Sequence, residues 1–251
     1  MKSLGQSRLF PPLLVGLLLV AAWYALRHFL ALEAFRLPVP HEILAAIWKE
    51  RQTLAGGVRV TFLASLGGFF AATFFGLALS LILTASRTLR RGFLPFVVLM
   101  QVIPIIATAA IVVTWLDAGF PAIITIAFFI GFFPVVANTL AGLRAVPAEQ
   151  LELFRLYKAT PLQELFLLRL PTAWPYFLTG AQIAATLAVI GSVTGEIFAG
   201  SSANAGLGFL IISYRASFET AAVFAATALC ALLAMVFWGA VRLVPTRFPA
   251  R

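Results

Sequence analysis

Charged residues are scarce in this chain of 251 residues, and acidic residues are scarcest. Asp and Glu number 9, Lys and Arg number 18, and charged residues make up 11% of the sequence against 62% for hydrophobic ones. A soluble domain carries about 25% charged residues because its surface faces water. This chain has too few charges to cover a globule of its size, so much of its exterior must face lipid.

Residues that form disulfides and metal sites are almost absent. Cys230 is the single cysteine and lies in an apolar run, which excludes an intramolecular disulfide and a cysteine metal cluster. We expect it to pack as a small apolar side chain. The two histidines, His28 and His41, match no metal-binding spacing, and the chain lacks the G-x-x-x-x-G-K-[ST] phosphate-binding motif. No metal or cofactor is therefore expected in this chain.

Long uncharged runs are what the sequence has in quantity. A helix that crosses the hydrocarbon core of a bilayer needs about 20 mostly apolar residues. Six runs predict an all-α membrane protein with six transmembrane helices, at residues 9–26, 60–85, 92–116, 118–143, 170–195 and 220–241. Only Asp117 separates the third and fourth runs, and with Gly119 and Pro121 beside it this position predicts a tight hairpin turn.

Three further segments differ from a plain transmembrane run. Run 9–26 could be the core of a cleavable signal, but it is longer than a usual signal core and no convincing cleavage site follows it, so we expect a retained helix. Residues 197–214 open with a glycine- and serine-rich stretch that lipid would leave poorly hydrogen-bonded, so we expect a loop with a short helix. Segment 40–51 has one apolar helical face, which predicts a helix lying on the membrane or packed against the bundle.

Positive charges fall unevenly between the two sides of the membrane. With the N-terminus inside, twelve Lys and Arg residues lie in cytoplasmic segments and six on the opposite side. Because cytoplasmic loops carry the excess of these residues, the sequence predicts a multi-pass protein of a bacterial inner membrane with both termini in the cytoplasm. The cytoplasmic set is Lys2, Arg8, Arg87, Arg90, Arg91, Arg144, Arg155, Lys158, Arg169, Arg242, Arg247 and Arg251.

The largest cytoplasmic segment, residues 145–171, has an amphipathic pattern. Pro147 fits the first turn of a helix, and Thr160 with Gln163 fits a capping box that starts a second one. The sequence predicts two short helices with a bend near Ala159, and it places Glu164 on the solvated face. Such a pair is either an ordinary surface feature or a docking element for a soluble partner.

This segment resembles the coupling motif of ABC importer permeases, commonly written E-A-A, three residues, G, nine residues, I-x-L-P. Glu152, Leu170 and Pro171 match the motif in identity, and the spacing matches throughout. The departures are Leu153, Phe154 and Lys158, the last standing where glycine is usual. A left-handed turn there would cost lysine about 1 kcal/mol relative to glycine.

Other segments are similar to landmarks of one branch of these permeases. The branch includes the permeases for nitrate, sulfonate, taurine, thiamine-precursor pyrimidines and riboflavin. The similar segments are 37–40, 101–104, 133–144, 191–196 and 206–211, and the similarity covers roughly residues 37 to 243. The amino-acid sequence at 154–159 is most similar to that of the pyrimidine-precursor and riboflavin permeases. This similarity favours a solute of that kind over nitrate, sulfonate or taurine.

The resemblance implies a type I ABC importer permease, a single domain over residues 1–251 with a core at 58–243 and a coupling loop at 145–171. It implies a second permease copy, most simply in a homodimer, together with a cytoplasmic ATPase dimer that binds ATP and Mg and a periplasmic solute-binding protein. The chain itself is then not an enzyme and has no nucleic-acid partner. The residues implied in coupling are Leu151, Glu152, Phe154, Lys158, Leu162, Leu170 and Pro171.

Polar residues inside spans are costly and often functional. Glu196 ends the fifth run, where it is either a gate or solute contact near the outer mouth or a carboxylate at the water interface that is paired or solvated. Four amide and hydroxyl residues either line the pathway or bond between helices, and two prolines either break helices beside it or kink them. These six are Gln101, Asn138, Gln182, Thr186, Pro104 and Pro134.

Two other classes fit the sequence less well. An ion-coupled secondary transporter would need a carboxylate within a span and a larger bundle with internal repeats, and neither is evident. A membrane-embedded enzyme would gather His or carboxylate side chains near its spans, whereas His28 and His41 both lie outside the apolar runs.

Overall fold

The computed structural model describes residues 10–31, 33 and 35–246, without the side chains of Phe10, Arg87 and Gln101. These residues form helices joined by turns, which confirms the predicted all-α class. The helices are α1 (Phe10–Phe29), α2 (Pro40–Lys49), α3 (Arg51–Ala85), α4 (Arg87–Val102), α5 (Ile105–Leu116), α6 (Phe120–Arg144), α7 (Ala148–Leu156), α8 (Pro161–Glu164), α9 (Leu170–Ala199), α10 (Leu207–Ala216) and α11 (Thr220–Arg242).

Five helical segments in the described part of the chain are long and apolar enough to cross a membrane: Pro11–Phe29, Arg51–Ala85, Phe120–Arg144, Pro161–Ala199 and Thr220–Arg242. α4 and α5 make a sixth span if they are counted together, although they meet at an angle of 100°. The third predicted span, 92–116, is therefore a broken segment rather than a straight helix. α10 is apolar but short, as predicted for residues 197–214.

Pro104 separates α4 from α5. Proline has no N–H to donate within a helix, and its ring disfavours the helical conformation in the residue before it. Ile103 and Pro104 accordingly have ψ angles of 125° and 128°, in the extended region. Pro134, by contrast, lies inside an unbroken α6, so a helix break at that residue is wrong. The buried neighbours Val135 and Val136 hold α6 between other helices there.

α3 begins before the predicted span, although Arg51 and Arg59 are charged. The apolar run predicted a helix from residue 60, yet α3 begins at Arg51 and has 35 residues. At 1.5 Å per residue it is about 50 Å long, against about 30 Å for the hydrocarbon core. Arg51 and Arg59 are compatible with helix that continues beyond the membrane, because charge limits insertion and not helix formation.

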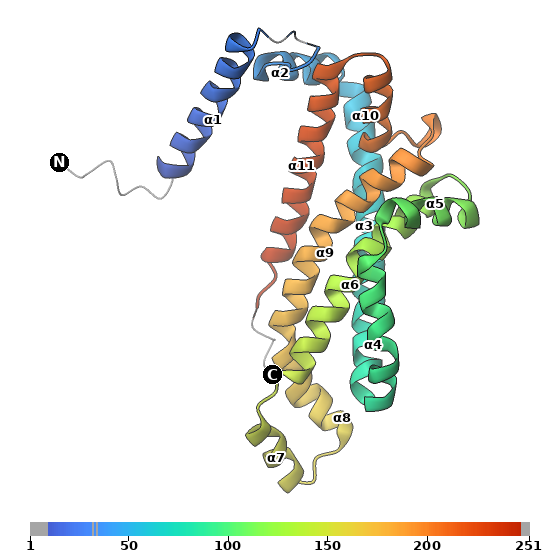
Figure 1. Cartoon of the computed structure of the whole chain (residues 1–251). Helices are drawn as coiled ribbons and strands as arrows, with labels where there is room; N and C mark the ends of the chain where they lie inside the picture. Colours follow the sequence, from blue (N-terminus) through green and yellow to red (C-terminus); the bar gives the residue numbers. More distant parts are fainter. Residues whose placement is uncertain (1–9, 32, 34, 247–251) are drawn as a thin grey trace, which may run out of the picture.

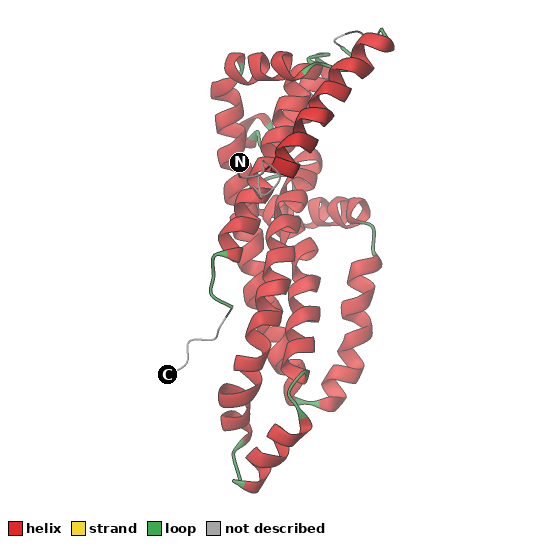
Figure 2. Ribbon diagram, turned by 90° about the vertical axis from the view of Figure 1, so that its left-hand side faces the viewer, coloured by secondary structure: helices red, strands yellow, loops and turns green. Residues whose placement is uncertain are grey.

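Small residues let α3, α6 and α9 approach closely at the centre of the bundle (Figure 1 and Figure 2). Contacts between α6 and α9 are the most extensive in the described chain. A Cβ added to Gly191 would lie 2.6 Å from the Cα of Ala127, and one added to Gly195 would lie 3.0 Å from the Cα of Ile123. In lipid, such close backbone approach replaces the hydrophobic effect as the source of helix association.

The two ends of the bundle are built differently (Figure 1). At the lower end in that view, here named the α7 end, α7 and α8 project beyond α6 and α9. At the opposite end, named the α10 end, lie α2 and α10. α2 packs against α3 and α11 and buries Ile43, while Leu44 and Trp48 on the same helix are exposed.

α1 stands apart from the other spans and is attached near its C-terminal end (Figure 1). The Trp23 ring packs 6.0 Å from that of Phe224 on α11. Arg27 donates to the Glu42 carboxylate at 2.7 Å, and this bond, with one from the N–H of Val39, lowers the pKa of Glu42. The earlier turns of α1 are exposed, including Leu13, Leu17 and Leu19.

Candidate functional site

The bend predicted near Ala159 is a Schellman motif at the end of α7. The N–H of Ala159 donates to the carbonyl of Phe154 at 2.9 Å, and the N–H of Lys158 donates to that of Arg155 at 3.0 Å. Lys158 has a φ of 52°, the left-handed conformation that this motif requires. It stands where the coupling motif has glycine, so the lysine keeps the turn geometry at a cost of about 1 kcal/mol.

We expect Lys158→Gly to keep the turn and to melt at or slightly above the parent. Glycine removes the left-handed penalty of about 1 kcal/mol, and its greater conformational freedom in the unfolded chain offsets part of this gain in stability. Lys158→Val is expected to melt lower than both, since a β-branched residue tolerates this conformation poorly. Thermal unfolding of the purified permease measures the order. A valine variant as stable as the glycine variant would show that residue 158 is not held left-handed.

After the bend, Thr160 and Gln163 form the predicted capping box, with bonds of 2.8 and 3.3 Å between each side chain and the other residue's N–H. The helix that starts there is not separate. A π-helical turn, Leu165–Arg169, joins α8 to α9, so that Pro161–Ala199 is one helical segment. α8 is therefore continuous with a candidate membrane span.

Arg169 ties the base of this loop to α6. It donates to the Glu164 carboxylate at 2.6 Å and to the carbonyl of Leu143, near the end of α6, at 3.0 Å. The side chains of Arg169 and Glu164 are 25% and 24% exposed. The prediction that Glu164 lies on a solvated face is therefore wrong. A π turn bonds residues five apart, and this spacing brings residues 164 and 169 together.

Four large apolar side chains of the loop are exposed. We name the surface that they form the α7 corner: Leu153, Leu156, Tyr157 and Leu162. Leu156 and Tyr157 are both 80% exposed. Leu153, Leu156 and Tyr157 lie outside the candidate spans, where large apolar side chains this exposed are typical of a surface that another protein covers.

The residues predicted for coupling divide between the two faces of the loop. Glu152, Lys158 and Leu162 are exposed, whereas Leu151 and Phe154 are half-buried. Leu170 and Pro171 are half-buried at the start of α9. Sequence reasoning missed Leu153, Leu156 and Tyr157, although the first two are three residues apart and so share a helical face.

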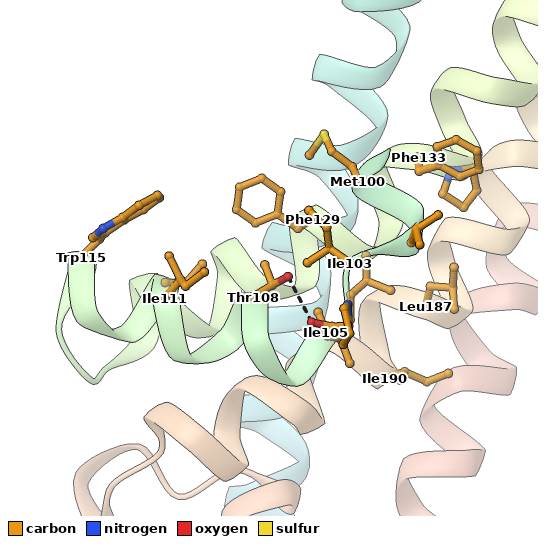
Figure 3. Close-up of a pocket in the computed structure, with 15 residues that line it drawn as sticks. Met100, Ile103, Ile105, Thr108, Ile111, Trp115, Phe129, Phe133, Leu187 and Ile190 are labelled. Atoms are coloured by element: carbon orange, nitrogen blue, oxygen red, sulfur yellow. Dashed lines mark hydrogen bonds between the residues drawn. The ribbon is translucent and has the colours of Figure 1, made fainter. Parts of the chain in front are cut away.

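A cavity of about 630 Å³ lies in the elbow between α4 and α5, against α6 and α9 (Figure 3). Its volume is in the range of pockets for small molecules. Trp115, Phe129 and Phe133 give it aromatic surface, and Thr108 supplies a hydroxyl that donates to the carbonyl of Pro104 at 3.4 Å. Among the described residues, no charged side chain lines it.

Two of the predicted pathway residues line this cavity. They are Pro104, at the break between α4 and α5, and Pro134, inside α6. The side chain of Gln101 lies outside the described residues. Figure 3 shows the aromatic rings and the elbow around the same space.

Three other predicted pathway residues lie on α6 and α9 but do not line the cavity. Asn138, Gln182 and Thr186 are half-buried. The amide of Asn138 donates to the carbonyl of Pro134 at 2.8 Å, and the hydroxyl of Thr186 donates to the carbonyl of Gln182 at 3.5 Å. Both bonds stay within one helix, so these residues carry polar groups without bridging two helices through these bonds.

Glu196 is fully buried near the end of α9. Its Oε2 accepts a bond from the hydroxyl of Thr61 on α3 at 3.1 Å and one from the N–H of Gly208 on α10 at 2.7 Å. Glu196 is therefore a buried, hydrogen-bonded carboxylate, and the alternative of a solvated carboxylate at the water interface is wrong. No group of three His, Cys, Asp or Glu side chains in the described part of the chain is placed to hold a metal ion.

The structure has the fold of a known transporter subunit. A chain of the MetNI methionine ABC transporter, solved in inward-facing conformations, matches it with a TM-score of 0.62 and 23% identity. The match covers 76% of this chain and 96% of that chain. At this identity the likeness concerns the arrangement of helices, and it confirms the predicted permease fold.

Sequence similarity is more specific. A probable ABC transporter permease protein of Haemophilus influenzae is 34% identical over 88% of this chain and 89% of its own length. The riboflavin transport system permease protein RibX of Chloroflexus aurantiacus is 32% identical, covering 88% and 82%. The formylaminopyrimidine transport permease protein ThiX of Halalkalibacterium halodurans is 30% identical, covering 92% and 91%. Residues 72–248 match the family described as binding-protein-dependent transport system inner membrane component, and the chain belongs to this family of ABC permeases.

Proposed function

We propose that this permease works in a bacterial inner membrane with its α7 end and both termini in the cytoplasm, as one domain with a core at 58–243 and a coupling loop at 145–171. The charge distribution supports this orientation. Arg90, Arg91, Arg144 and Arg155 belong to segments at the α7 end, where cytoplasmic positive charge is expected. The α10 end then faces the periplasm and the solute-binding protein.

The loop 145–171 docks on a cytoplasmic ATPase, which binds ATP and Mg and performs the hydrolysis. The observation that carries this assignment is the α7 corner, an exposed apolar surface on a loop tied to α6 by Arg169 and continuous with α9. An ATPase bound to this surface can therefore transmit its movement through the loop to the spans α6 and α9. The whole coupling set (Leu151, Glu152, Phe154, Lys158, Leu162, Leu170 and Pro171) belongs to this loop.

A second copy of the chain completes the pathway. The cavity at the α4–α5 elbow is bounded on one side by α5, whose Ile106 and Trp115 are 62% and 76% exposed. One bundle of this size leaves that side open, and a homodimer is the simplest way to close it. Pro104 and Pro134 line this half of the pathway, and Gln101, Asn138, Gln182 and Thr186 are its proposed polar contacts.

The solute is an uncharged ring compound of the pyrimidine or riboflavin kind. The lining of the cavity is apolar and aromatic, with Trp115, Phe129 and Phe133 offering ring faces and no described cation to pair with nitrate, a sulfonate or taurine. Flat rings stack on such surfaces. The names of the relatives RibX and ThiX agree with this choice.

Reconstitution tests the proposal. The permease, its partner ATPase and its solute-binding protein are assembled in proteoliposomes with ATP. Riboflavin or a substituted aminopyrimidine is expected to stabilise the binding protein in a thermal-shift screen and to be taken up only with ATP, whereas taurine, nitrate and an alkanesulfonate are not. Uptake of taurine or nitrate alone would refute the solute class, and uptake without the ATPase would refute the ABC mechanism.

A further inference from the structure

The first two N–H groups of α10 are bonded to side chains from two other helices. The N–H of Leu207 donates to the Thr61 hydroxyl at 2.9 Å, and the N–H of Gly208 donates to the Glu196 carboxylate at 2.7 Å. The Thr61 hydroxyl in turn donates to the same carboxylate oxygen at 3.1 Å. Thr61, Glu196 and Leu207 are all 0% exposed. α3, α9 and α10 therefore meet at one buried carboxylate, an arrangement we name the Glu196 clamp.

The N-terminus of α10 supplies the positive partner of the Glu196 carboxylate, a role that lysine or arginine has in an ion pair. The described ion pairs join Arg27 to Glu42, Lys49 to Glu50 and Glu219, and Arg169 to Glu164, and Glu196 is in none of them. The unsatisfied N–H groups and the positive end of the helix dipole at an N-terminus favour an acceptor that carries negative charge. The carboxylate thus replaces a capping side chain that Gly206, the residue before α10, does not have.

Two glycines leave the space that this carboxylate occupies. A Cβ added to Gly206 would overlap the carboxylate atoms of Glu196, and one added to Gly208 would overlap the carbonyl oxygen of Val193. Leu207, between them, is fully buried. The Gly206-Leu207-Gly208 segment is therefore shaped to receive Glu196 rather than to be flexible.

Further buried polar atoms lie beside the clamp. Ser65 follows Thr61 by one helical turn on α3, and Ser192 precedes Glu196 by one turn on the antiparallel α9. The two hydroxyls and the Oε1 of Glu196 are buried without a hydrogen-bond partner. An amide in place of the carboxylate would keep one oxygen as the acceptor for the Gly208 N–H and would put an NH₂ group in the place of Oε1.

We infer that Glu196 is a positioning residue that holds α10 on α3 and α9, so that these three helices move as one body at the α10 end during transport. This inference rests on the proposed function. α10 then does not swing away to admit the solute.

The clamp itself is tested on purified permease, without ATPase or solute. In a Cys230→Ala background, Leu210→Cys reports on the buried face of α10, since Leu210 is 5% exposed. Labelling by a water-soluble maleimide is expected to rise at least about tenfold with Glu196→Ala and to stay within about threefold of the parent with Glu196→Gln. Thr61→Val, which keeps the volume and removes the hydroxyl, gives the same test if Glu196→Ala is not recovered. Unchanged labelling in both Glu196→Ala and Thr61→Val, or a Glu196→Gln rate equal to that of Glu196→Ala, would overturn the clamp.

The common movement is tested with a cysteine pair in the same Cys230→Ala background. A Cβ added to Gly57 on α3 would lie 2.7 Å from the Cδ1 of Leu210, so Gly57→Cys with Leu210→Cys lets two short side chains share the space that the leucine fills. Oxidation of the pair is expected to leave ATP-driven uptake within about twofold of the reduced protein. Uptake that stops on oxidation and returns on reduction would show that α10 moves against α3. Uptake absent from the cysteine-free parent would instead count against the proposed function.

Discussion

Leu156→Asp is expected to leave the permease folded and inserted while lowering its affinity for the partner ATPase by at least about 30-fold and abolishing ATP-driven uptake. Leu156 is 80% exposed at the end of α7, so the chain itself loses little when the side chain changes. Truncating an interface anchor typically costs about 2 kcal/mol or more, which corresponds to this factor. A charge at the same position adds the cost of desolvation.

The other loop variants separate docking from folding. Glu152→Ala removes a carboxylate that is exposed in the free permease and buried when the ATPase is docked. Loss of one partner of a charged hydrogen bond buried at an interface costs about 2–5 kcal/mol. Glu149→Ala, exposed in the first turn of the same helix, is the matched control and should behave as the parent. Glu164→Ala is unsuitable as a control, because it breaks the bond to Arg169. ATPase pull-down and vesicle uptake are the measurements. If Leu156→Asp and Glu152→Ala both bind ATPase and transport normally, the loop is only a surface feature.

Gly191→Leu is expected to destabilise the bundle by about 3 kcal/mol, at the upper end of overpacking costs. The first carbon of the new side chain would lie 2.6 Å from the Cα of Ala127 and 3.1 Å from the Cδ1 of Ile130. A backbone atom cannot rotate away, so α6 and α9 must separate. Their contact is the most extensive of the described structure, and its loss should lower both the melting temperature and the yield of inserted protein.

Gly239→Leu is the matched control on α11. Nothing lies within 4 Å of a Cβ built on Gly239, and leucine is a better helix former than glycine by up to about 1 kcal/mol. The control should therefore melt at or above the parent. Equal melting temperatures for the Gly191 and Gly239 variants would show that α6 and α9 are not packed through these glycines.

Features that depend on composition and local pattern could be predicted from the sequence. Apolar runs marked the spans because lipid exposure demands them over whole helices. The capping box at Thr160 and the bend at Lys158 were visible because their chemistry involves residues a few positions apart. The exposed position of Tyr157 in the α7 corner was harder to predict. This residue follows the last residue of α7, and the turn sets its position.

Features that depend on distant partners could not be predicted. Glu196 is bonded to Thr61, 135 residues away, and to a backbone N–H that leaves no signature in the sequence. The pairing of Glu164 with Arg169 depends on a π turn, which no local rule indicated. Pro104 and Pro134 are the same residue type in similar apolar runs, yet only the first separates two helices. Tertiary packing decides between the two outcomes.

The exposed position of α1 bears on how such a chain can evolve. Because Leu13, Leu17 and Leu19 contact little of the bundle, almost any apolar side chain can take their places, and substitutions there should be nearly neutral. The contacts of Gly191 with α6 leave no such freedom. The first helix can therefore accept far more sequence change than the inner glycines without loss of the bundle.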